Sequence, residues 1–475
     1  MLTAVALPLG GLALLAVVWV FFGLERRDRP EVVLAVVVGA VLLQALLYTS
    51  DQGVPVGPFR PGPARLPELL IGAALVARFL ARGAPTRISA AAMAWTAFLV
   101  WYGSSAIVGF LEGNPTDVIV FEARAILYVG GCAILAAGVT PGRLVTKKLL
   151  GSWFVVLGTL GAVMVTLSFL GLTPPLDVPL LRVPSLGGLG ADAASLLILI
   201  GAIGLLVELT YARRRRRVLI ATIPMGLAWM AGLQRASVVN FAVVLTVLCL
   251  VAAGSTWSRR IRATPTELGL FVAAAVAIGV LATLSGARSG DIAVPFELGD
   301  RIESAFTGVG NTNSAGARLN KYDEGNDLIA ERPVMGWGLA KQITSFYPGI
   351  NGGGRFGTTA VFDSVPYDLV VRTGAVGLLL FLIAMALSLR DGLRAWVRHP
   401  DNAVAALGMG AFAGAMGLLG KGLVESVLDK VVLACALGVL VGIMAAAASD
   451  RTRARPVLRG GVAERGDAAV GVASY

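Results

Sequence analysis

Two types of charged side chain stand where a very apolar chain turns polar, and together they suit chemistry on a phosphate. Arg235 falls between two apolar runs, and Arg318 lies in a polar segment over residues 286–360. A guanidinium group presents a planar set of donors that matches phosphate oxygens, which favours binding of a diphosphate. Asp363 follows the polar segment, and a carboxylate can accept a proton as a general base. The pattern predicts an anion site beside a proton acceptor.

Each of these residues also has a plainer structural interpretation. Arg235 would snorkel to the lipid headgroups if it only marked the end of a transmembrane helix. Asp363 precedes Ser364, and either residue suits the N-cap of the helix that follows. Gly336 and Gly338 permit a tight turn, and a Gly-x-Gly pair alone is weak evidence for phosphate binding. The sequence leaves both interpretations of each residue open.

Four more charged residues are candidates for contact with a substrate. Glu122 and Arg124 lie inside an apolar run, where an unpaired charge costs about 2.5–3.5 kcal/mol, so both should face the bundle interior. At i and i+2 they do not pair easily with each other, so each needs another partner, either Arg372 or a bound phosphate. Arg372 follows Asp368 by one helical turn, and mutual neutralisation of these two favours a structural role. Arg182, in a loop, is the fourth candidate.

The elements that must position these residues are transmembrane helices. The chain has 475 residues, of which 56% are apolar and only 15% charged, whereas a soluble domain has about 25% charged residues. The formal net charge of +11 comes from arginines in short loops, where positive charge fixes topology, so it does not indicate a nucleic-acid partner. The composition predicts an all-α integral membrane protein.

About twelve to thirteen apolar runs are long enough to cross a ~30 Å hydrocarbon core as helices. Their arginine- and lysine-rich loops fall on one side, which the positive-inside rule assigns to the cytoplasm. The loop 286–360 is therefore predicted to be extracytoplasmic, and residues 1–449 to form one polytopic membrane domain. The predicted spans are 2–24, 31–49, 66–81, 88–111, 118–139, 149–172, 191–211, 218–233, 236–254, 266–285, 364–388, 402–420 and 431–449.

Three further segments have their own predictions. The first run lacks a basic n-region and a cleavage motif, which indicates a retained helix and no cleaved signal peptide. The segment Leu319–Ala330 has helical spacing of apolar residues and is predicted to lie on the outer membrane surface. The polar tail 450–475 is rich in Gly, Arg and Ala and is predicted to be a disordered cytoplasmic segment.

Metal and disulfide chemistry find no support in the sequence. Cys132, Cys249 and Cys435 lie in apolar runs without CxxC or CxxH spacing and are interpreted as small hydrophobic residues. His399 falls in a predicted basic loop from Arg394 to Asp401. Because it is the only histidine, a two-histidine metal site is excluded. No cofactor and no metal are expected.

The order of these features resembles the O-antigen ligase and polysaccharide polymerase superfamily over about residues 190–450. That order comprises Arg235 at a helix start, a long outside loop with Arg318, the Pro-x-x-Gly-x-Gly turn Pro333–Gly338, and Asp363 eleven positions before Gly374-x-x-Gly377. The resemblance implies a glycosyltransferase-C-like bundle with one large extracytoplasmic loop. It also implies a multi-pass protein of the bacterial cytoplasmic (inner) membrane.

The resemblance implies transfer of a glycan from a polyprenyl diphosphate carrier to a glycan or lipid acceptor at the outer face of the membrane. Arg235 and Arg318 match the family's two diphosphate-binding arginines. The ligases carry a His-Asn pair where this chain has Asp363-Ser364, whereas many exopolysaccharide polymerases are similar to this chain in carrying Asp. The expectation is therefore an inverting, metal-independent polymerase with Asp363 as base.

Two other functions stay open. An O-antigen-type ligase would move a glycan to a lipid or protein acceptor. A strain that lacks such a ligase would accumulate long lipid-linked chains. A transporter or flippase of a lipid-linked substrate would use paired repeats and helices interrupted near the midplane, and neither pattern is evident in the sequence. Within the enzyme class, the sequence does not name the sugar or the linkage.

Overall fold

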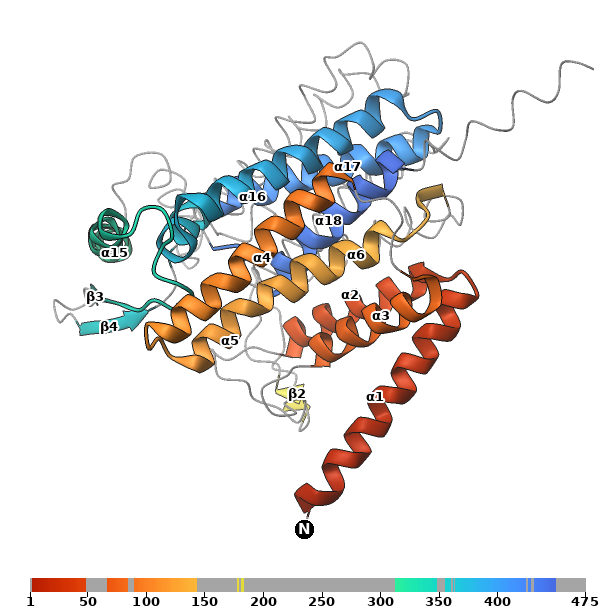
Figure 1. The fold of residues 1–475 in the computed structure, drawn as a ribbon, viewed down its shortest axis with the longest axis horizontal. Coiled ribbons are helices and arrows are strands. Elements are labelled where there is room, and N and C mark those ends of the chain that lie inside the picture. The colour runs from red at the N-terminus through yellow and green to blue at the C-terminus, as the bar shows by residue number, and fades with distance from the viewer. Residues whose placement is uncertain are drawn as a thin grey trace, which may run out of the picture.

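The computed structural model of the protein describes residues 2–47, 66–83, 89–142, 177–178, 181–182, 312–347, 355–359, 362, 364–423, 426–428 and 431–449. Within these ranges, it describes only the backbone of residues 2–11, 42–47, 177–178, 181–182, 312–320, 345–347 and 355–359. Helices dominate the described part of the chain (Figure 1), with two short antiparallel strand pairs.

The described elements follow one another along the chain in three groups. The first holds α1 (Leu2–Arg26), α2 (Pro30–Leu47), α3 (Leu66–Arg82), α4 (Ala90–Leu111), α5 (Thr116–Ala125), the π-helical turn η1 (Ile126–Gly131) and α6 (Cys132–Ala137). The second holds the strands β1 (Asp177–Val178) and β2 (Leu181–Arg182). The third holds α15 (Thr312–Glu331), β3 (Ile343–Tyr347), β4 (Arg355–Thr359), α16 (Val365–Arg398), α17 (Asn402–Gly422) and α18 (Val431–Ser449).

The prediction of an all-α integral membrane protein is confirmed. Five described helical segments are long and apolar enough to cross a membrane, namely α4, the continuous α5–η1–α6, α16, α17 and α18. Of the predicted spans, the first five and the last three coincide with described helices. The remaining spans, from 149–172 to 266–285, lie outside the described residues, as do the tail 450–475 and Cys249.

Aromatic packing joins α4 to α16 in the core of the bundle. The ring of Phe381 on α16 lies 5.4 Å from that of Phe98 and 5.9 Å from that of Trp95. Trp95 Nε1 donates a hydrogen bond to Ser388 Oγ at 2.9 Å, so the indole N–H is satisfied inside the apolar core. These contacts hold the two helices that carry most of the site described below.

Small residues bring α18 against the α5–η1–α6 helix. A methyl group at Gly438 would collide with the carbonyl oxygen of Val129, and one at Gly442 with that of Ala133. Spacing of small residues by four allows close approach of two transmembrane backbones. Cys132 and Cys435 face each other across this contact as buried thiols, with Sγ atoms 3.4 Å apart, which agrees with their interpretation as small hydrophobic residues.

The helix α16 is longer than predicted, because it continues ten residues past 388 to Arg398. The prediction of a basic loop from Arg394 to Asp401 is therefore wrong as far as Arg398, and Arg390, Arg394 and Arg398 are all helical. Their spacing of four places them along one exposed side of the helix, while Trp396 is buried on the other. The next helix begins at an aspartate cap, where Asp401 Oδ1 accepts a hydrogen bond from Ala403 N at 2.8 Å.

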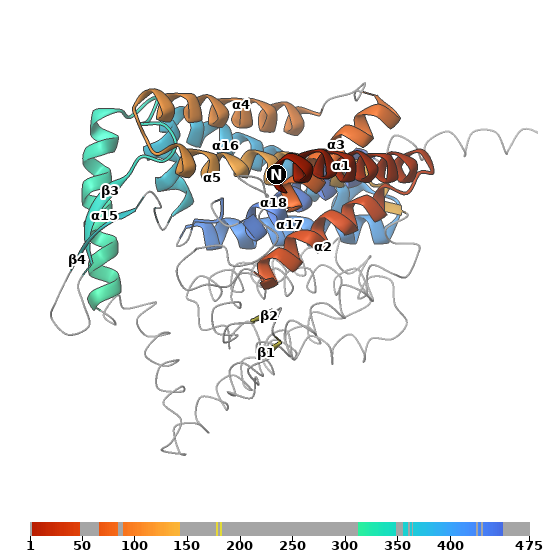
Figure 2. The same ribbon diagram turned by 90° about the horizontal axis from the view of Figure 1, so that it is seen from below.

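The polar segment carries structure of its own at one end of the bundle. Figure 1 shows α15 nearly end-on and Figure 2 shows it along its length, so it runs roughly perpendicular to α4 and α16. The strands β3 and β4 pair antiparallel beside it, with Ile343 opposite Thr359. The predicted extracytoplasmic loop is thus a folded cap of helix and hairpin where it is described.

Candidate functional site

A kink in α16 forms the centre of the site. Gly374 has φ 69° and ψ −178°, which interrupts the helix and removes the usual partners of the carbonyl groups one turn earlier. The backbone N–H groups of Trp337 and Gly338 replace those partners, donating to Val371 O and Arg372 O at 2.9 Å each. The turn Pro333–Gly338 therefore docks into the kink.

The docking is reciprocal. The N–H groups of Ala375 and Val376, which the kink also frees, donate to Pro333 O at 2.8 Å and Val334 O at 3.5 Å. Trp101 on α4 closes the set, because its Nε1 donates to Thr373 O at 2.9 Å. Irregular backbone is tolerated at membrane depth only where protein satisfies its polar groups, and here the turn and the kink satisfy each other.

Glycines make this contact possible at both surfaces. Gly336 and Gly338 have φ of 70° and 82°, a region that side chains disfavour. A methyl group at Gly338 would collide with the backbone nitrogen of Gly109 on α4, and one at Gly374 with the carbonyl of Val334. The predicted Pro-x-x-Gly-x-Gly and Gly-x-x-Gly motifs are therefore two halves of one packed unit.

The turn is not arranged to hold a phosphate with its backbone. Gly336 N donates to Arg332 O at 3.2 Å, Leu339 N to Ser105 O at 2.9 Å, and the two N–H groups between them donate to α16. Ala340 N donates to Glu122 Oε2 at 2.6 Å. Because all five successive N–H groups are used within the protein, the structure supports the plain-turn interpretation of Gly336-x-Gly338.

Arg372 lies at the centre of a buried charge network directly beside the kink. Its side chain is fully buried, with Nη1 2.7 Å from Asp368 Oδ2 and Nη2 3.1 Å from Glu122 Oε1. The second Glu122 oxygen accepts the hydrogen bond from Ala340, so the network joins α5, the turn and α16. Of the two partners that the sequence offered for Glu122, Arg372 is confirmed, and so is its pairing with Asp368.

Arg124 pairs on the other side of α5. Its Nε lies 3.1 Å from Glu68 Oε1 on α3, and Tyr128 Oη donates to the same Glu68 oxygen at 3.3 Å. Sequence reasoning missed Glu68, although it is the single acidic residue of the span 66–81. An acidic residue alone in one apolar run and an arginine in another is a signal for such a pair.

The chain enters α16 through a short segment that the network also contacts. Phe362 is fully buried, and its N–H donates to Asp368 Oδ1 at 3.4 Å. Ser364 occupies the predicted N-cap position with extended backbone angles, yet its side chain makes no capping hydrogen bond. Asp363 lies between these two residues and is outside the described part of the chain.

The helix α15 uses its apolar side for packing on protein. Tyr367 Oη on α16 donates to Tyr322 O at 2.6 Å, and Ile329 packs beside Phe362. A methyl group at Gly325 would collide with the ring of Tyr367 at 2.7 Å. The prediction that Leu319–Ala330 is helical is confirmed within the longer α15, but the side that was to face the lipid covers the start of α16.

Arg318 belongs to the same side of α15 by register. At 100° per residue, its position falls within about 40° of Tyr322, Gly325 and Ile329 around the helix axis. Of the other predicted site residues, Arg182 forms part of β2, and it pairs with Asp177 of β1. Arg235 lies outside the described residues.

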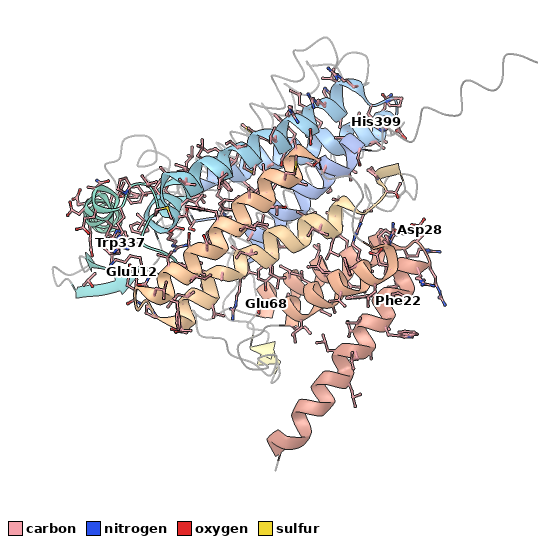
Figure 3. All side chains as sticks on the ribbon, viewed as in Figure 1. Phe22, Asp28, Glu68, Glu112, Trp337 and His399 are labelled. Atoms are coloured by element: carbon pink, nitrogen blue, oxygen red, sulfur yellow. The ribbon has the colours of Figure 1, made fainter. Side chains whose placement is uncertain are left out.

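In the described ranges, no group of three or more His, Cys, Asp or Glu side chains could hold a metal ion. The only histidine, His399, ends α16 at the side of the bundle opposite to Trp337 (Figure 3). A helix of 34 residues separates it from the start of α16, about 50 Å at 1.5 Å per residue. His399 is therefore remote from the turn, the kink and the buried network.

The fold and this site define a multi-pass membrane protein with a folded polar cap locked into a kinked helix. A model of the family described as O-Antigen ligase matches residues 220–382, about a third of the chain, which includes the cap, the turn and the kink. The match confirms the resemblance to the O-antigen ligase and polysaccharide polymerase superfamily and supports glycan transfer as the type of activity. A comparison with curated proteins finds no match.

Proposed function

We propose that the protein is a polymerase that transfers lipid-diphosphate-linked oligosaccharide repeat units to a growing surface polysaccharide at the outer face of the cytoplasmic membrane. The family match supports glycan transfer in general. The observation that carries the proposal is the convergence on the start of α16. There the side of α15 that includes position 318 packs against Phe362, which precedes Asp363, and Tyr367, which follows it on α16.

The proposed reaction is a direct displacement. The acceptor hydroxyl attacks the anomeric carbon as Asp363 takes its proton, and the bond from that carbon to the phosphate oxygen breaks. The polyprenyl diphosphate leaves with the bonding electrons, and the guanidinium groups of Arg235 and Arg318 stabilise the charge that develops on it. Attack from the side opposite to the leaving group inverts the anomeric configuration. In this reaction the arginines stabilise the leaving diphosphate, a role that a metal cation has in other enzymes.

The buried charged residues that the structure describes have a structural role in this proposal. Glu122 and Arg372 pair with each other, and Arg124 pairs with Glu68, so their predicted contact with substrate has competition from protein partners. We assign Glu122 and Arg372 to holding the turn and the entry to α16 in register. Arg182 is kept as a candidate contact for the glycan.

A ligase is the second candidate, because the matching family is described as O-Antigen ligase. Ligases of this family place a histidine where this chain has Asp363, and His399 is too remote to replace it. A deletion strain separates the two functions. Accumulation of single lipid-linked repeat units is expected for a polymerase, and accumulation of long lipid-linked chains would favour the ligase.

The orientation of the cap is tested by reporter fusions. A reporter active only outside the cytoplasm is expected to be active when fused near Gly310 and inactive when fused after Arg217, because the arginine-rich loops favour the cytoplasm. Activity after Arg217 would reverse the orientation and place the cap on the cytoplasmic side.

Arginine-to-lysine variants test the diphosphate site. Arg235→Lys and Arg318→Lys keep the charge but lose the bidentate fork, so each is expected to insert normally and to lose most transfer from a lipid-linked donor, about 100-fold or more. Arg332→Lys is a matched control in the same cap, since Arg332 pairs with Glu112 through one nitrogen at 2.7 Å. Normal transfer by either test variant would remove that arginine from the site.

A further inference from the structure

The tip of the docked turn presents apolar side chains on the outside of the bundle. Val334 and Met335 are 55% and 53% exposed, although they stand in a polar segment. The hydrogen bond from Val376 to Val334 places the tip beside α16, one helical turn before Leu379, which is 58% exposed. The tip therefore continues the exposed apolar surface of α16.

Two cations flank this tip on a single aromatic ring. The guanidinium carbon of Arg332 lies 4.0 Å from the centroid of the Trp337 ring, and the ammonium nitrogen of Lys341 lies 4.1 Å from it. Trp337 is itself fixed, because its Nε1 donates to Leu328 O at 2.8 Å and its backbone N–H is bound to α16. The Trp337 ring thus brings both cations to the residues next to the tip.

One carboxylate accompanies the two cations. Glu112, just past the end of α4, lies 2.7 Å from Arg332, and Figure 3 shows Glu112 and Trp337 at the same end of the bundle. The hydrogen bond from Arg332 holds the pKa of the Glu112 carboxyl below its usual value, so this group is ionised at neutral pH. The three charged groups together carry one net positive charge.

We propose that this turn binds the phosphate of an anionic phospholipid from the adjacent leaflet. Trp and basic residues at a helix end are the usual anchors at the membrane–water boundary. Here Val334 and Met335 would contact the upper acyl chains while Arg332 and Lys341 face the phosphate level. A phosphodiester carries one negative charge, which complements the net charge of the Glu112, Arg332 and Lys341 cluster. This site is independent of the proposed transfer reaction.

The inference predicts a local preference for anionic lipid that a probe on the tip can read. The full-length protein carrying Met335→Cys is labelled with a fluorophore and reconstituted into phosphatidylcholine vesicles with one fifth phosphatidylglycerol. Quenching by phosphatidylglycerol with a headgroup nitroxide is compared with quenching by phosphatidylcholine bearing the same group. Protein without Met335→Cys, treated alike, gives the background from Cys132, Cys249 and Cys435. We expect a preference for phosphatidylglycerol of about fivefold, from one unbalanced basic residue.

Three variants test how the charged cluster sets the preference for phosphatidylglycerol. Lys341→Gln is expected to abolish the preference, and Lys341→Arg to retain it. Glu112→Gln removes the competing carboxylate and is expected to raise the preference further, whereas loss of a merely structural ion pair would not. Lys321→Gln, at the same end of the bundle on α15, serves as the matched control and is expected to leave the preference unchanged.

Three outcomes would overturn the proposal. Equal preference in Lys341→Gln and the unsubstituted protein would show that the cluster does not select lipid. Loss of the preference in millimolar inorganic phosphate would make the cluster a site for free anions. Displacement of phosphatidylglycerol by an equimolar polyprenyl diphosphate would make it a donor site. Persistence of the preference in both competitors supports the phospholipid.

Discussion

Replacement of Arg372 by methionine is expected to lower the free energy of unfolding by about 3–5 kcal/mol, because it leaves two buried carboxylates without their shared cation. Asp368 and Glu122 lie 2.7 and 3.1 Å from the guanidinium, and all three side chains are buried. Denaturant unfolding of the purified protein in mixed micelles measures the change.

Arg124→Met is the matched control for this substitution. Arg124 has one carboxylate partner within the described ion pairs, and its side chain is 14% exposed rather than fully buried. The loss of stability is therefore expected to be smaller than for Arg372→Met. An equal loss of unfolding free energy in both variants would mean that the second carboxylate beside Arg372 adds nothing to the cost of its removal.

A second substitution separates charge from packing. Glu122→Gln keeps an oxygen that can accept the Ala340 N–H but removes one of the two negative charges. The double variant Glu122→Gln, Arg372→Met is expected to be more stable than the sum of the single losses predicts, because the groups are in contact. Strict additivity would contradict the network.

The length of the apolar runs was sufficient to predict the membrane-spanning helices that the structure describes, because an apolar run has few alternatives to a helix in lipid. It was least accurate at their ends. The run that begins at Val365 loses its apolar character after residue 388, but Arg390 and Arg394 form an exposed face that extends the same helix. Hydropathy indicates whether the side chains of a helix suit lipid or water, and it does not indicate where the helix ends.

The kink and its partner turn were not predictable as a unit. Each glycine motif is visible in the sequence, and Gly336, Gly338 and Gly374 each suggest a turn or close approach. Their mutual docking depends on hydrogen bonds between Trp337 and Val371, which stand 34 positions apart. Local patterns contain no information about which backbone groups meet across that interval.

The charges show what sequence reasoning can and cannot supply. The cost of an unpaired charge in a membrane correctly required partners for Glu122 and Arg124. It offered Arg372 as one partner and left out Glu68, because the choice between carboxylates depends on how α3 and α5 are rotated against each other. The proposed roles of Arg235, Arg318 and Asp363 stay predictions that substitutions must test.

Asp363→Asn is expected to lower the turnover of a lipid-linked donor by about 100 to 10,000-fold while donor binding is retained, because asparagine keeps the shape of aspartate but cannot accept a proton. Elongation by the purified variant and its affinity for the donor are measured in parallel. On either side of Asp363, the N–H of Phe362 donates to Asp368 and Ser364 makes no side-chain cap, so the substitution is the test of its role.

The opposing interpretation makes Asp363 only a helix cap, and an aspartate that is a cap in the structure provides the comparison. Asp401 accepts a hydrogen bond from Ala403 N at the start of α17. Asparagine caps a helix as well as aspartate does, so Asp401→Asn is expected to retain both stability and turnover. If Asp363→Asn also elongates normally, Asp363 is a cap, and Arg235 and Arg318 would bind the diphosphate without an identified base. If elongation fails in Asp363→Asn alone while both variants unfold like the unsubstituted protein, the carboxylate acts on the acceptor proton.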